Sequence, residues 1–175
     1  MRFAAAAVLA ALFVSSAIAQ NLPRCNSQLL TRQGNHISMS AHALSNVLNR
    51  RLAAAGSEYH NLLLVPQANN RLRVAAIKNG DTVSIVGPVQ TTDHGEVQIH
   101  AEKILKNGAP MKGFMDLFGQ DLGDRMHPKD PSILNVQGND LIIHPDPLLG
   151  LRGQATGVQL VGSRIEMQFA SPPCR

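Results

Sequence analysis

The sequence contains no tryptophan, one tyrosine and five phenylalanines among its 175 residues. Aromatic side chains supply the large flat surfaces on which rings stack, so their shortage argues against a carbohydrate-binding site. The apolar character comes instead from Leu, Ile, Val, Ala and Met. Flexible aliphatic and thioether side chains adapt well to alkyl groups.

Recognisable catalytic motifs are also lacking. The chain has no GxSxG or SxxK motif, no cysteine beside a histidine, no Walker-type loop and no dinucleotide fingerprint. Its aspartates occur singly, without the isolated pair that acid–base catalysis needs. We therefore expect a protein that is not an enzyme and that needs no cofactor.

The one polar cluster with the residue types of a metal site is His94, Glu96 and His100. Their even spacing places them on one face of an extended strand, but it separates the two histidines by about 20 Å. One ion cannot bridge that distance, so we expect a solvated polar face and no metal. A hydrolase that uses these three residues is the least favoured alternative.

The first nineteen residues have the features of a secretory signal peptide. A positive Met1-Arg2 start precedes the apolar run 3–14, and the small-x-small site 17–19 precedes Gln20. The run is too short for a comfortable membrane span. We expect cleavage between Ala19 and Gln20, leaving residues 20–175 as a single domain in the periplasm or outside the cell.

Charge is only mildly positive. The full chain carries a formal charge of +4, and loss of Arg2 would leave +3, without any basic block. A concentrated basic patch is the usual mark of nucleic-acid binding, so we expect no nucleic-acid partner. A weak, peripheral attraction to anionic membrane headgroups stays open.

Periodicity predicts an α+β domain. Ser38 or Ser40 caps a short helix that ends at Gly56, after which the period changes to two. Asn-Gly pairs at 79–80 and 107–108 indicate hairpin turns in an antiparallel meander. The predicted strands cover residues 60–66, 71–77, 82–89 and 96–104, and then 133–137, 140–144, 155–160 and 164–169.

A second helix, rich in Met and Phe, is predicted from Pro110 to Met126. Its apolar residues cover more than a narrow stripe, which fits one wall of a lipid-sized groove. From periodicity alone, an ordinary core helix that lies on a sheet is the favoured interpretation. The apolar stretch 145–151 is another ambiguous feature, for which folding back onto the core is favoured over an exposed contact.

The order of elements resembles a known group of proteins. The segments that show this order are Asn69–Val74, Val97–Ile104, Gly108–Phe118 and Gly138–Ile143, followed by two strands that end at Phe169. This layout resembles small exported bacterial domains distantly related to the tubular lipid-binding superfamily. The resemblance implies a long curved antiparallel sheet packed against a helix, with acyl chains held between them.

We therefore expect a protein that binds a lipid or other apolar small molecule in a groove between the Met/Phe-rich helix and the sheet. The alternative is a secreted protein-interaction module that uses a strand edge or the 145–151 segment. The residues expected to bind the ligand are Met111, Phe114, Met115, Phe118 and Leu122 on the helix, and Val74, Ile85, Val97 and Ile99 on the sheet.

The two cysteines, Cys25 and Cys174, lie near the two ends of the mature chain, and we predict that they form a disulfide. Closing a loop of about 150 residues stabilises the fold by at most ~5 kcal/mol in the chain-entropy model. Denatured protein isolated from an oxidising compartment should react with maleimide only after reduction. The Cys174→Ser variant should expose one reactive thiol, whereas two free thiols in the unreduced natural chain would contradict the pairing.

Overall fold

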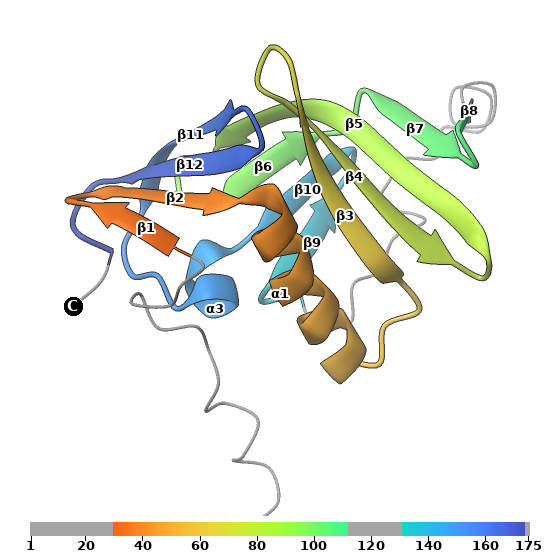
Figure 1. Ribbon diagram of the computed structural model, residues 1–175, viewed down its shortest axis with the longest axis horizontal. Coiled ribbons are helices and arrows are strands. Elements are labelled where there is room, and N and C mark those ends of the chain that lie inside the picture. The colour runs from red at the N-terminus through yellow and green to blue at the C-terminus, as the bar shows by residue number, and fades with distance from the viewer. Residues whose placement is uncertain (1–29, 112–130, 174–175) are drawn as a thin grey trace, which may run out of the picture.

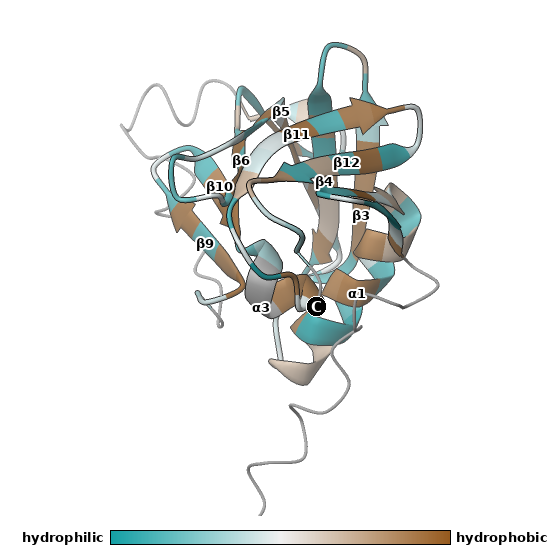
Figure 2. Ribbon diagram, turned by 90° about the vertical axis from the view of Figure 1, so that its left-hand side faces the viewer, coloured by the Kyte–Doolittle hydropathy of each residue, from teal (hydrophilic) through white to brown (hydrophobic). Residues whose placement is uncertain are grey.

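The computed structural model describes residues 30–111 and 131–173, most of which belong to two antiparallel β-sheets (Figure 1). The smaller sheet has the strand order β1-β2-β12-β11. Its strands are β1 (Leu30–Gln33), β2 (His36–Ser40), β11 (Ala155–Val161) and β12 (Arg164–Phe169). Hydrophobic and hydrophilic residues alternate along β12 (Figure 2), as expected for a sheet with one buried face.

The larger sheet has the strand order β3-β4-β5-β6-β10-β9. In addition, β7 pairs with β5, and β8 pairs with β7. Its first strands form the predicted meander, because β3, β4, β5 and β6 are neighbours in chain order. The strands are β3 (His60–Gln67), β4 (Arg71–Lys78), β5 (Asp81–Thr91), β6 (Val97–His100), β7 (Lys103–Lys106), β8 (Ala109–Pro110), β9 (Leu134–Gln137) and β10 (Asp140–Ile143).

Strand β5 pairs with β4 along one edge, and along its other edge it changes partner at Gly87. Its first half pairs with β7, from Val83 to Val86, and its second half pairs with β6, from Val89 to Thr91. A Cβ atom at Gly87 would lie 1.5 Å from the backbone oxygen of His100. Only glycine allows β5 to pass this close to the connection between β6 and β7.

The described helices are α1 (Ala41–Ala54) and the short α3 (Pro145–Leu149). The Ser40 side chain caps α1 by accepting a hydrogen bond of 3.0 Å from Ala43 N. At the other end Gly56 has φ +60°, and Ser57 N donates to Leu52 O while Gly56 N donates to Ala53 O. These two bonds form a Schellman motif, so both predicted ends of this helix are confirmed.

Asn70 connects the two sheets. It lies with Asn69 in the β3–β4 turn, where both residues have positive φ, as a tight hairpin requires. Its amide nitrogen donates to Val89 O of β5 and to Val158 O of β11, at 2.8 and 3.2 Å. Its side-chain oxygen accepts from Leu160 N of β11 at 2.8 Å. One side chain therefore satisfies backbone groups in both sheets.

The buried core runs between the two sheets and is closed by α1 and α3. Leu148 and Leu149 of α3, and Leu151 after it, are at most 3% exposed. The 145–151 segment therefore folds back onto the core, as the favoured prediction held. These three leucines are therefore not exposed to a partner protein.

The predicted architecture, one curved sheet packed against a long Met/Phe-rich helix, is wrong. The described chain is dominated by strands in two antiparallel sheets, and the helix that packs on them is α1. Pro110, expected to begin the long helix, belongs to strand β8. The fixed φ of proline suits an edge strand as well as a first helical turn, so Pro110 alone does not distinguish a helix from a strand.

Two smaller predictions also need correction. The single strand expected over 96–104 is interrupted at Ala101 and Glu102, because this segment crosses over Gly87 between β6 and β7. Residues 20–37 show no clear period and predict a tethered N-terminal segment, but within the described part of that range β1 forms and β2 begins. The pattern was missed because β1 is mostly exposed and shows no alternation.

Several predictions concern residues outside the described part of the chain. These are the signal peptide 1–19, the cysteines Cys25 and Cys174, and the expected ligand contacts Phe114, Met115, Phe118 and Leu122. Within residues 30–111 and 131–173, no helix has the length and apolar character needed to cross a bilayer.

Replacing Gly87 with alanine should destabilise the protein by about 3 kcal/mol or more, because the added methyl group cannot fit against the His100 backbone. Chemical denaturation measures the free energy of unfolding. Gly157→Ala in β11 is the matched control, since a Cβ there would lie 3.8 Å from Gln168 Cβ, an ordinary contact. Equal effects of the two substitutions would contradict the role given to Gly87.

Candidate functional site

A cavity of about 240 Å³ lies between helix α1 and the inner face of the larger sheet. Most of its lining is aliphatic. The wall on the helix side includes Leu48 and Leu52, and the opposite wall comes from β3, β4, β5 and β10, together with Ile133 and Leu134. The aliphatic residues from these four strands are Leu62, Leu64, Val74, Ala76, Val83, Ile85, Leu141 and Ile143.

Strand register explains why this wall is apolar. Leu64 pairs with Val74, which in turn pairs with Ile85, so the three side chains share one face across β3, β4 and β5. Ala76 pairs with Val83 two residues further along the same face. Side chains of a strand alternate between faces, and every second residue here is aliphatic.

Helix α1 is attached to the edge of β3 through polar side chains. Asn49 bonds both backbone groups of Leu62: its amide nitrogen donates to Leu62 O at 2.8 Å, and its oxygen accepts from Leu62 N at 2.7 Å. Ser45 Oγ accepts from Leu64 N at 2.9 Å and donates to Ala41 O at 2.8 Å. The helix therefore takes the place of a further strand and covers the sheet edge.

The polar residues of the cavity wall come mainly from the end of α1 and the connection to β3. They are Arg51, Ser57 and Tyr59. Beside them, Lys78 Nζ lies 3.0 Å from Glu58 Oε2 and 4.9 Å from the centre of the Tyr59 ring. The hydrogen bond to Glu58 raises the pKa of Lys78, so its ammonium group stays charged and paired.

Ser84 belongs to the cavity wall, but its hydroxyl group is not a polar anchor within it. Ser84 alternates with Val83 and Ile85, so its side chain is on the opposite face of β5. There its Oγ is buried and has no hydrogen-bond partner. Arg51 is thus the charged residue in the described lining.

The structure brings only some of the predicted binding residues to this cavity. Val74 and Ile85 line it, whereas Val97 and Ile99 line a separate space of about 30 Å³. A water molecule needs about 10–15 Å³ by this measure, so the second space is too small for an organic ligand. Met111, partly exposed after β8, does not line either space.

Sequence reasoning missed the contribution of α1. The helical spacing places Leu48 and Leu52 on one apolar face, but it does not indicate that this face borders a cavity. Asn49 and Ser45, one turn apart on the same helix, carried a usable signal, because polar residues beside an apolar stripe can bond a strand edge.

The three residues of the expected polar face take part in separate interactions or none. His100 Nδ1 lies 2.7 Å from Asp140, and Glu96 lies 3.2 Å from His144 Nδ1 and 3.0 Å from Thr92 Oγ1. His94 is exposed. Residues 30–111 and 131–173 contain no group of three potential metal ligands.

Comparison with protein-family models, with curated proteins and with solved structures gave no match for this chain.

Asn49→Ala should destabilise the protein by about 2 kcal/mol, since two hydrogen bonds to the β3 edge are lost at about 1 kcal/mol each. Thermal and chemical unfolding check this expectation. Asn46→Ala is the matched control, because Asn46 is exposed on the same helix and bonds only His42, at 3.3 Å. If both variants unfold alike, the attachment of α1 through Asn49 is disproved.

Proposed function

We propose that the protein binds a small apolar ligand, such as the hydrocarbon chain of a single-chain lipid, in the cavity between α1 and the sheet. The observation that carries the proposal is the cavity of about 240 Å³ with its largely aliphatic lining. An apolar cavity of about 150 Å³ is enough to bind benzene, so this one has room for a guest. Drug-sized pockets occupy roughly 300–1,000 Å³, which favours one alkyl chain over a two-chain phospholipid.

The chemistry of the lining agrees with this proposal. Leu, Ile, Val and Ala side chains offer no directional contacts, so recognition would depend on removing apolar surface from water. A tail that buries about eight methylene groups gains roughly 6 kcal/mol, at 0.8 kcal/mol each. Loss of rotational and translational freedom offsets part of this gain, so we expect a dissociation constant between about 0.1 mM and a few millimolar.

The expected binding groove and the proposed one differ in their helix. The sequence pointed to residues 110–126, whereas the cavity is walled by α1. Both versions share the sheet residues Val74 and Ile85. An exported protein would meet such ligands at the cell envelope, so a role in envelope lipid handling belongs to the same proposal.

Filling the cavity tests the proposal. Ala76→Leu places a larger side chain among Leu64, Val74 and Val83, and should reduce the affinity for the neutral probe decanol at least about tenfold. Ala75→Leu, one residue earlier on the opposite face of β4, is the matched control and should bind like the natural chain. Isothermal titration calorimetry gives the affinities, and methyl NMR shows which side chains respond.

Decanol should shift the methyl signals of the lining residues Leu48, Leu62 and Val83 in the natural chain. Absence of any shift would contradict the proposal. So would an Ala76→Leu variant that is more stable to heat yet binds decanol as before, because the cavity would then be a packing defect remote from the ligand.

A further inference from the structure

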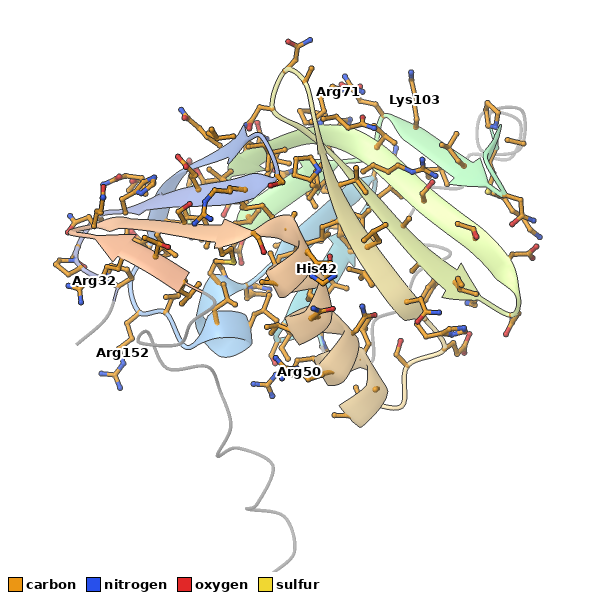
Figure 3. All side chains as sticks on the ribbon, viewed as in Figure 1. Arg32, His42, Arg50, Arg71, Lys103 and Arg152 are labelled. Carbon is orange, nitrogen blue, oxygen red and sulfur yellow. The ribbon has the colours of Figure 1, made fainter. Side chains whose placement is uncertain are left out.

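Arg51 is a charged side chain in the wall of an apolar cavity. It lies in the last turn of α1, and its side chain is partly exposed. No side-chain hydrogen bond or ion pair engages its guanidinium group within residues 30–111 and 131–173. The other arginine of this turn, Arg50, is exposed, does not line the cavity and extends away from α1 in Figure 3.

The neighbouring charges at this end of the cavity are already compensated. Lys78 and Glu58 form an ion pair at 3.0 Å, and the ammonium group also lies over the Tyr59 ring. Ser57 Oγ accepts a hydrogen bond from Tyr59 N at 3.1 Å. Among the described residues that line the cavity, Arg51 is therefore a charged side chain without an ion-pair partner.

A basic residue in the last turn of a helix also interacts favourably with the helix dipole. That role explains a positive charge at either Arg50 or Arg51, but it does not require one of them to lie against a cavity. Arg51 lines the cavity together with aliphatic side chains, so an anionic head group on a ligand held there would find an unpaired positive charge close by. Its planar fork matches a carboxylate with two parallel hydrogen bonds.

We propose that the ligand is a linear amphiphile with a carboxylate head, whose tail fills the cavity and whose head pairs with Arg51. This inference rests on the proposed function, since it assigns the head group of the ligand that the cavity accepts. Arg51 then determines specificity: it distinguishes an anionic head from a neutral one of equal chain length. The lining selects the tail, and the guanidinium selects the head.

Decanoate and decanol separate the two contributions, because they share a chain length and differ in the charge of the head. The natural chain should bind decanoate about tenfold more tightly than decanol at neutral pH, as one charge-assisted contact allows. Arg51→Gln should remove this preference, so that decanoate and decanol bind with affinities within about twofold of each other. Arg51→Lys should restore part of it, since an ammonium group keeps the charge without the fork.

Arg50→Gln is the matched control, with the same change of charge one residue away and outside the cavity. It should bind both probes like the natural chain. An equal loss of decanoate affinity in the Arg50 and Arg51 variants would overturn the inference, because general surface charge would then account for it. Thermal unfolding shows that each variant is folded, and glutamine suits a helix nearly as well as arginine.

Failure of the two proposals gives different results. If decanol binds in the cavity and decanoate shows no advantage, the role of Arg51 is overturned and the apolar cavity stands as the binding site. If neither probe binds, the proposed function fails and takes this inference with it. A decanoate preference that persists in Arg51→Gln would place the head group at another residue and overturn the assignment.

Discussion

The attachment of α1 to the edge of β3 is the constraint on which the cavity depends. An exposed strand edge leaves backbone donors and acceptors without partners, and here two side chains of a helix supply them. Hydrogen bonds are directional, so Ser45 and Asn49 fix the position of the helix along and across the strand. Leu48 and Leu52 are thereby held over the sheet, and the helix cannot slide to close the space beneath them.

The far wall of the cavity depends on how the larger sheet is built. Strand β5 is long enough to serve both β7 and β6, and it can do so because Gly87 lets the backbone of His100 approach. Asn70 then ties this sheet to β11 through two side-chain hydrogen bonds, and a third holds the same side chain to Val89 O of β5. Apolar burial drives the two sheets together, while these polar contacts fix where they meet.

In the proposed site, the aliphatic lining binds the tail of the ligand and Arg51 binds its head group. Aliphatic side chains on paired strands give a surface that holds a chain by desolvation and does not discriminate between similar tails. Discrimination needs a polar group at the rim, where water and ligand head meet. Arg51 lines the cavity from the same helix as Leu48 and Leu52, so in the proposed site α1 would contact both the head and the tail of the ligand.

Local physical chemistry made much of the fold predictable. The cap at Ser40, the terminator at Gly56 and the Asn-Gly turns depend on a few neighbouring residues, and each was found in the sequence. The predicted strands 60–66 and 71–77 imply the turn at Asn69–Asn70, but the bonds from Asn70 to β11 were not predicted because these partners lie up to 90 residues away. Strand β1 was missed because it is exposed, so no hydrophobic alternation marks it.

The sequence by itself determined an aliphatic, antiparallel β-rich chain with a capped helix at 41–54, because periodicity and turn chemistry act over short distances. Only the tertiary structure decided that there are two sheets, that β5 changes partner at Gly87, and that α1 covers the edge of β3. It also decided which apolar residues border a cavity. A leucine that packs and a leucine that lines a cavity look alike in sequence, because the difference is the distance to atoms remote in the chain.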